Sequence, residues 1–453
     1  MKRWSRRSFL AASVAATAGP VLAAPAPKKA PPRKDEPRTG IDVVIVGAGA
    51  AGIAAARRLT AAGRRVALVE ANDRIGGRCV TDTTIFGVPY DRGAHWIHAP
   101  EINPVAKLAG ETGLDIYPAP PGQRIRIGRR YARESELEDY LANLVRANSA
   151  ISEAARGRAD VPCIQPLPKE LGEWRATIEF FLGPFGCSKD LAEVSAFDFA
   201  RAAERDHDAF CRQGFGTLLA KLADRLPVQL SAPVSAIDWA GRPGVTVETA
   251  RGRIAAGAVI VTVSTNVLTA GKIRFSPELP RRHLDAAARL KLGSYDHITL
   301  ELPDNPLGLR PDELVFEKSV GRRTAALFAN ASGSTLCMVD VAGSFGRELA
   351  AKGEKEMVAF ALDWLGGLYG SDMRGAVRRS HATRWNDEPW VLGASSVAAP
   401  GAQPSRRVLM EPLGNRLWFA GEAAHETLWG TVGGAWESGE RAADAVLKTF
   451  GRR

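Results

Sequence analysis

The chain has 453 residues, of which 45% are hydrophobic and 24% are charged. This composition is typical of a globular protein with one large core or two domains, and it excludes a largely disordered chain or a bundle of membrane helices. The net charge is +10, but residues 1–40 hold nine Lys and Arg against two acids, so the rest of the chain carries only +3. We therefore expect no nucleic-acid-binding face.

The N-terminal segment predicts export. Residues 1–26 combine a basic start, an apolar stretch of small residues and Ala-rich cleavage options, as in a signal peptide. Within it, Ser5-Arg6-Arg7-Ser8-Phe9-Leu10 resembles the twin-arginine signal, which implies export of the folded protein by the twin-arginine machinery to the periplasm or beyond. An ordinary secretory signal or a basic tail is the alternative. The Pro- and charge-rich residues 27–40 predict a linker.

The sequence also lacks two features, a membrane-spanning segment and cysteines at paired metal-ligand spacing. No later segment is apolar for long enough to span a bilayer, so we expect no stable membrane anchor. The five cysteines are scattered without paired metal-ligand spacing, which predicts buried thiols, no metal site and no assignable disulfide.

A dinucleotide-binding unit is predicted at residues 41–72. An apolar strand, Ile41–Val46, leads into a glycine-rich turn and an Ala-rich helix that runs to about Ala62. A second strand, Val66–Val69, ends in an acid that can hydrogen-bond a ribose hydroxyl, while the glycines let the backbone approach a pyrophosphate at the helix start. The cofactor-binding residues expected here are Gly47, Gly49, Ala51, Gly52 and Glu70.

Two other segments carry related patterns. The Arg-x-Gly-Gly-Arg run from Arg74 to Arg78 includes Gly77, where the chain can pass close to a cofactor, and Arg78 presents a planar fork suited to phosphate oxygens. Near the C-terminus, a strand at residues 417–420 is followed by Gly421 and Glu422 and by a helix that begins between residues 431 and 434.

These segments, together with residues 231–280, resemble the flavin amine oxidase superfamily over nearly the whole chain beyond residue 41. The resemblance implies bound FAD, with the backbone of Val234 at the adenine and Glu422 near the ribityl-phosphate region. It also places the Thr431-Val432 backbone at the flavin ring, where a helix N-terminus stabilises negative charge.

The implied fold class is α/β, with a Rossmann-type FAD-binding domain and a mixed-sheet substrate domain that are discontinuous in sequence. We expect the FAD-binding domain at residues 41–120, 208–290 and 391–450, and the substrate domain at residues 121–207 and 291–390. The second domain should include a helix near Glu134–Ala155.

Residues 81–114 resemble polyamine and spermine oxidases through a Gly-Ala-x-Trp-Ile-His run followed by Asn-Pro. In amino-acid oxidases of the superfamily an arginine holds the substrate carboxylate at the position of Trp96, so its absence favours an amine. The resemblance places Ala94, His95 and Trp96 beside the flavin and His98 in the active site, with structural packing as the alternative for Trp96 and His98.

Departures from the family pattern limit this inference. The cysteine that holds FAD covalently in monoamine oxidases aligns with Ala394, which predicts non-covalent FAD. The two aromatic residues that flank the amine in many relatives align with Ser395 and Thr431. Three tryptophans could substitute for them, with packing as the alternative for each: Trp385, Trp390 and Trp429.

The stretch "DHITLEL", residues 296–302, has the alternation of a strand with one buried face, which by itself places His297 on the wet face. The resemblance instead places His297 where the family has a lysine that is held through a water to flavin N5. We expect His297 to orient this water or to take a proton from the substrate ammonium.

The expected function is oxidation of a polyamine or monoamine by hydride transfer to flavin N5, giving an imine that hydrolyses. The electrons would then pass to O2 or to a periplasmic acceptor, and the missing lysine leaves that choice open. The alternatives are a flavin-dependent C–C dehydrogenase or desaturase, or a non-catalytic FAD-bearing binding protein. Neither the amine nor the oligomeric state follows from the sequence.

Overall fold

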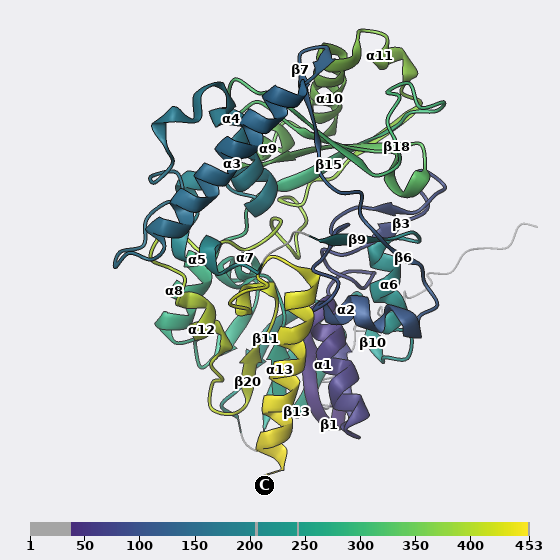
Figure 1. Ribbon diagram of the computed structural model, residues 1–453. Coiled ribbons are helices and arrows are strands. Elements are labelled where there is room, and N and C mark those ends of the chain that lie inside the picture. The colour runs from purple at the N-terminus through teal and green to yellow at the C-terminus, as the bar shows by residue number, and fades with distance from the viewer. Residues whose placement is uncertain (1–37, 204–206, 242–243, 452–453) are drawn as a thin grey trace, which may run out of the picture. The chain divides into compact units, whose positions relative to one another are not determined.

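The computed structural model describes residues 38–203, 207–241 and 244–451 (Figure 1). The predicted signal peptide, and with it the twin-arginine motif, lies outside the described residues, as does most of the predicted linker. Strand β1 (Arg38–Val46) begins three residues before the linker was expected to end. None of the helices within the described ranges is both long and apolar enough to cross a bilayer.

The first of two large sheets is built around the predicted dinucleotide-binding unit. Its central strand β1 pairs in parallel with β2 (Val66–Val69) and with β13 (Gly252–Val261). The order along the sheet is β10-β2-β1-β13-β12-β11-β14, and β20 pairs with β13. The remaining strands are β10 (Val228–Gln229), β11 (Val234–Asp238), β12 (Val245–Thr249), β14 (Arg274–Ser276) and β20 (Leu417–Phe419).

The first and last helices of the described chain pack side by side on this sheet (Figure 1). Helix α1 (Ala50–Ala61) is rich in alanine, and α13 (Val432–Phe450) crosses it so closely that a Cβ on Gly439 would lie 2.1 Å from the Ala51 carbonyl oxygen. Both helices begin at the same edge of the sheet, where β1 ends, so their N-termini point toward one region.

The second sheet has seven strands in the order β19-β15-β18-β17-β16-β7-β8. Neighbours are antiparallel except β16 and β7, so the sheet is mixed, as expected. Helices α9 (Gly343–Ala350) and α10 (Glu354–Tyr369) cover one face. The strands are β7 (Arg124–Ile127), β8 (Arg130–Tyr131), β15 (Tyr295–Glu301), β16 (Glu313–Glu317), β17 (Ala326–Ala329), β18 (Leu336–Ala342) and β19 (Arg379–Ala382).

Strand β15 corrects one expectation from the sequence alone. Ile298 and Leu300 lie in the core beneath α9 and α10, as the alternation predicts. The opposite face is not wet, however, because it looks toward the first sheet, and His297 on that face is only 6% exposed. The alternation of apolar and polar residues therefore identified one buried face of β15 correctly. It could not show that the opposite face of the strand is also covered.

Smaller elements connect the sheets. Helix α3 (Glu134–Ala154) forms where it was expected, and α4 (Arg175–Phe180) continues into a π-helical turn, η3 (Phe181–Phe185). A short sheet joins β5 (Ile97–His98), β9 (Asp208–Cys211) and β6 (Ile116–Pro118). The remaining elements are β3 (Thr81–Asp82), β4 (Tyr90–Asp91), α2 (Pro104–Leu108), η1 (Ala109–Glu111), η2 (Lys169–Trp174), η4 (Leu191–Glu193), α5 (Ala196–Arg201), α6 (Phe215–Leu222), α7 (Thr265–Thr269), α8 (Arg281–Arg289), η5 (Ala331–Gly333), α11 (Met373–Ala376), α12 (Ser405–Met410) and η6 (Glu422–Ala424).

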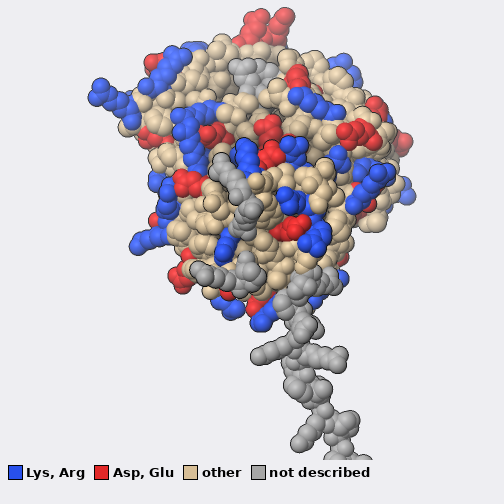
Figure 2. Space-filling model, turned by 90° about the horizontal axis from the view of Figure 1, so that it is seen from below, with Lys and Arg blue, Asp and Glu red and all other residues tan. Residues whose placement is uncertain are grey.

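The structure also shows how charged side chains are distributed on one face and where the cysteines lie. On the face seen in Figure 2, Lys and Arg side chains are interspersed with Asp and Glu side chains, without a broad field of one sign. All five cysteines are buried.

Candidate active site

One cavity of about 1300 Å³ lies where the two sheets face each other, and both sheets contribute to its wall. The predicted site residues that line it are Gly47, Gly49, Ala51, Glu70, Gly77, Arg78, Ala94, His95, Trp96, His98, Val234, His297, Trp385, Gly421, Glu422, Thr431 and Val432. The tryptophans Trp390 and Trp429 line it as well. Residues from four distant stretches of the chain are thus brought together.

Gly52 is the predicted site residue that does not line the cavity. It lies in the first turn of α1, where an added Cβ would come within 1.9 Å of the Gly47 carbonyl oxygen. Its role is therefore close packing of the turn against the helix rather than contact with a ligand.

The first sheet presents a site that fits a dinucleotide. The chain turns at Gly47, which has φ of +103°, and α1 then begins with Gly49 as N-cap. This helix start has neither a side-chain cap nor an acidic residue in its first turn, so its N–H groups and positive dipole are available to an anion in the cavity. At the end of β2, the Glu70 carboxylate accepts from the backbone N–H groups of Ala48 (2.7 Å) and Asn72 (2.9 Å).

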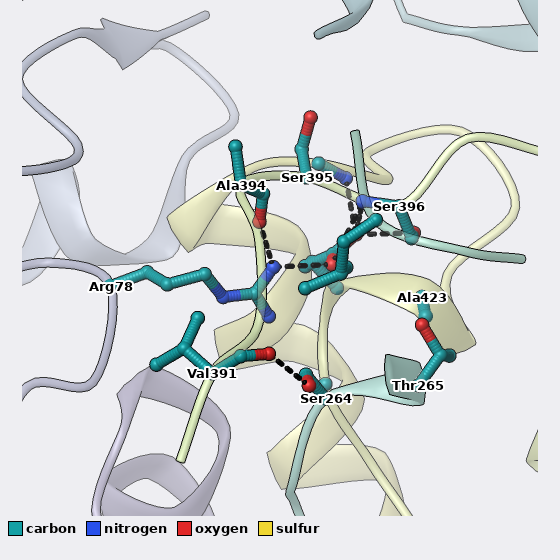
Figure 3. Close-up of polar contacts among 12 residues, drawn as sticks. Arg78, Ser264, Thr265, Val391, Ala394, Ser395, Ser396 and Ala423 are labelled. Atoms are coloured by element: carbon teal, nitrogen blue, oxygen red, sulfur yellow. Dashed lines mark hydrogen bonds and ion pairs between the residues drawn. The ribbon is translucent and has the colours of Figure 1, made fainter. Parts of the chain in front are cut away.

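The Arg-x-Gly-Gly-Arg segment packs directly on this turn. The Gly76 N–H donates to the Ala48 carbonyl at 2.8 Å, and both Gly76 and Gly77 have positive φ. Arg78 Nη1 donates to the Ala394 carbonyl and to Glu422 Oε1, the latter at 2.8 Å (Figure 3). Within the described residues no partner is found for Arg78 Nε or Nη2, so these groups remain available to a phosphate.

Glu422 ties three segments of the cavity wall together. Besides Arg78, it accepts from the Ser396 N–H and hydroxyl and from the Gly430 N–H. Burial alone would raise the pKa of Glu422, but the charge of Arg78 and the hydrogen bonds from Ser396 and Arg78 hold it below the usual range. The carboxylate therefore stays ionised and fastens these segments around the cavity.

Helix α13 supplies the second N-terminus at the cavity. Thr431 is its N-cap, since its hydroxyl accepts from the Gly434 N–H at 2.9 Å and donates to the Leu428 carbonyl at 2.7 Å. Its first turn contains no acidic residue, so the Val432 end of the helix presents a positive dipole to the cavity. This capping role explains a threonine at the position where relatives were expected to carry an aromatic residue.

His297 is held between two acceptors. Its Nδ1 lies 2.6 Å from Asp340 Oδ1, and its Nε2 lies 3.0 Å from the Gly93 carbonyl oxygen. A carboxylate and a carbonyl both require a donor, so both ring nitrogens carry a proton and the ring is an imidazolium. Burial by itself would lower the pKa of His297, but the charge of Asp340 and the hydrogen bonds to Asp340 and Gly93 raise it to about 9.

This arrangement revises the role expected for His297. A doubly bonded imidazolium has no lone pair, so it cannot take a proton from an ammonium, and it is instead a buried cation balanced by Asp340. Asp340, which also accepts from the Tyr295 hydroxyl at 2.8 Å, was missed in the sequence. Its signal was a single acid within the otherwise apolar strand "LCMVDVA".

The other histidines of the cavity differ in what they offer. His98 Nδ1 is bonded to Asp208 Oδ1 at 2.8 Å, its side chain is 25% exposed, and no partner of its Nε2 is found among the described residues. His95 Nδ1 is similarly bonded to Asp91, but its Nε2 is buried and the ring stacks on Phe210. Only His98 of these two presents a ring nitrogen that a small molecule can reach.

The tryptophans are anchored to the protein rather than arranged as a cage. Trp385 Nε1 donates to the Arg92 carbonyl at 2.8 Å, and the ring of Trp429 lies against the Arg406 guanidinium. Trp390 stacks on the Lys272 ammonium. The Ser395 hydroxyl, at the other expected cage position, bonds the Ser188 hydroxyl at 2.8 Å.

An apolar wall that the sequence analysis did not identify lines the cavity opposite the dinucleotide site. It is formed by side chains of the π-helical turn and of β16, namely Phe181, Leu182, Phe185 and Leu314. Because these residues come from two separated segments, no local pattern marked them as one surface.

Comparison with known proteins agrees with this architecture. The family model described as flavin containing amine oxidoreductase matches residues 50–135 and 142–447. The chain is 27% identical to polyamine oxidase 4 of Oryza sativa subsp. japonica, over 90% of this chain and 88% of that protein. It is 28% identical to lysine-specific histone demethylase 1B of Mus musculus over 89% of this chain, which spans about half the length of that relative.

Solved structures share the fold at lower identity. A putrescine oxidase with redesigned cofactor binding has a TM-score of 0.77 at 23% identity, covering 90% of this chain and 99% of that one. The cyclohexylamine oxidase from Brevibacterium oxydans has a TM-score of 0.74 at 24% identity, covering 91% and 100%. The predicted two-domain α/β fold is thereby confirmed.

The imidazolium at residue 297 predicts a specific pH dependence of stability. The pKa of His297 is about 9 in the folded protein and about 6.5 in the unfolded chain. The contribution of protonated His297 to the free energy of unfolding is therefore fully present below pH 6.5 and is lost as the pH rises through 9. The difference in unfolding free energy between wild type and His297→Gln should therefore narrow by roughly 1–3 kcal/mol between pH 6.5 and 9, as measured by urea denaturation. His381→Gln is the control, since burial lowers the pKa of His381, and it should show no narrowing. If the unfolding free energies of wild type and His297→Gln differ by the same amount at every pH, His297 is not an imidazolium in the folded protein.

Proposed function

We propose, on the premise that this chain belongs to the family of flavin-containing amine oxidoreductases, that it oxidises an amine at the carbon next to nitrogen with the help of FAD. The proposal rests on one observation. A single cavity is lined by a dinucleotide-binding turn, Glu70 and Arg78, and also by an apolar wall and by His297, whose ring is bonded to Asp340. Cofactor and substrate would share this space.

The chain's residues fit FAD in the cavity. The N-terminus of α1 and Arg78 would hold the pyrophosphate, Glu70 a ribose hydroxyl, and the N-terminus of α13 the flavin end. Ala394 lines the cavity with a methyl group only, which supports non-covalent binding. The chemistry that FAD supplies when bound is a two-electron oxidation of the C–N bond, with the electrons passed on to O2 or to another acceptor.

Two histidines of the cavity differ in whether they can take a proton from the substrate. The imidazolium of His297 is balanced by Asp340 and has both N–H groups bonded, so it takes no proton from the substrate. His98 can take the proton that the incoming ammonium releases, because Asp208 holds a proton on Nδ1 and leaves the lone pair of Nε2 toward the cavity. The resulting iminium product is hydrolysed to a carbonyl compound and an amine or ammonia.

The central test is anaerobic mixing of the FAD-loaded protein with a panel of amines, amino acids and non-amine reductants. We expect at least one amine to bleach the flavin absorbance, because the cavity combines the cofactor site with a proton acceptor. If only non-amine compounds bleach the flavin absorbance, the protein is instead a C–C dehydrogenase. The rate at which absorbance recovers in air then distinguishes an oxidase from an enzyme that uses another acceptor.

The role of His98 predicts a loss of activity. His98→Gln should lower kcat/KM by roughly 10²-fold near neutral pH, since a general base contributes on that scale. The control is His207→Gln, at an exposed histidine that pairs with Glu101, and it should lower kcat/KM far less. Equal values of kcat/KM for wild type and His98→Gln would rule out the proton-acceptor role.

We further propose that the protein is exported in folded form, which suits an enzyme that must acquire FAD before crossing a membrane. The support is the twin-arginine motif at residues 5–10. Replacing Arg6 and Arg7 together by lysine should retain the protein in the cytoplasm, as measured by fractionation and immunoblotting. Equal periplasmic amounts of the two forms would show that this motif is not used.

A further inference from the structure

The substrate side of the cavity has an apolar wall that continues up to His297. The rings of Phe181 and Phe185 are stacked with centroids 6.1 Å apart, and Phe185 lies 6.0 Å from Tyr295. The Tyr295 ring in turn lies 5.5 Å from the His297 ring, edge to face. The Tyr295 ring therefore lies between these two phenylalanines and His297.

This wall is firmly held from behind. Phe181, Phe185 and Leu314 are only partly buried and pack on the fully buried Phe316 and Ala326. The π-helical turn that carries the two phenylalanines contains Pro184, which abuts Gly343 so closely that a Cβ there would lie 2.8 Å from the proline Cγ. The side chains thus present a preformed apolar surface to the cavity.

The carboxylates around the cavity are already committed to other groups. Five carboxylates line it among the described residues. Glu70 accepts from the Ala48 N–H, Glu422 pairs with Arg78, and Asp208 is bonded to His98. Asp312, two residues from Leu314, accepts from the Tyr117 hydroxyl and the Ser332 N–H. The fifth, Glu101, has a side chain that is 58% exposed and pairs with His207.

We propose that the substrate is an apolar monoamine, with an aliphatic, alicyclic or arylalkyl group, and that diamines and polyamines are excluded. This inference rests on the proposed function and specifies its substrate class. A second ammonium beside Phe181, Phe185 and Leu314 would lose its hydration, and Asp312, the carboxylate nearest to Leu314 in sequence, already accepts two hydrogen bonds. Buried charges without a partner are strongly unfavourable.

Binding and catalysis can be separated with amines that lack hydrogen on the carbon next to nitrogen. Such amines can bind but cannot be oxidised, so calorimetry on the FAD-loaded protein measures affinity alone. We expect 2-phenylpropan-2-amine to bind with a Kd at least about 10-fold lower than that of 2,5-dimethylhexane-2,5-diamine. Equal or tighter binding of the diamine would overturn the proposal, whether or not any amine is oxidised.

A matched pair of variants tests the role of the wall. Leu314→Asp adds a carboxylate beside Phe181 and Phe185, and should lower the Kd of the diamine by roughly 10-fold, while Leu314→Asn adds polarity without charge and should not. If Leu314→Asp does not fold, the wild-type comparison still decides the question. Two outcomes separate the proposals. If no amine of the panel bleaches the flavin but the monoamine probe binds more tightly than the diamine probe, amine oxidation is wrong while the preference of the cavity for apolar monoamines is supported.

Discussion

The site depends on an imidazolium held between two parts of the fold. His297 extends from the second sheet and bonds Asp340 of the neighbouring strand, while its other nitrogen reaches the Gly93 carbonyl. Gly93 belongs to the loop that leads to Ala94, His95 and Trp96, which also line the cavity, so this hydrogen bond ties that loop to the second sheet. Because the pair is buried, loss of either partner would leave an uncompensated charge.

Behind the cofactor side lies a chain of alternating buried charges. Arg78 bonds Glu422, which accepts from the Ser396 hydroxyl, and this hydroxyl accepts from Arg406. Arg406 and Asp198 form an ion pair in which both side chains are fully buried. Each charge has a partner of opposite sign, so the network holds the segments around residues 78, 396 and 422 in one arrangement.

The two halves of the cavity are built on different physical principles. The cofactor side uses backbone N–H groups, helix dipoles and paired charges, which suit an anionic ligand. The substrate side includes an aromatic and aliphatic surface, formed by Phe181, Leu182, Phe185 and Leu314. Relatives named for a diamine and for a cyclic monoamine share the fold, so the fold does not choose the substrate, and side chains such as Phe185 and Leu314 must do so.

The sequence alone determined the family, the α/β class and the dinucleotide-binding elements. These depend on short-range features, such as the turn at Gly47, the acid at the end of β2 and the helix that begins near residue 431, which a local pattern reveals. Only the tertiary structure decided that His297 is charged, because its partners lie 43 and 204 residues away. The apolar wall likewise joins the turn at Phe181–Phe185 to a strand more than a hundred residues later. Protonation and pocket shape are set by what packs around a side chain, and that packing joins segments which no local pattern connects.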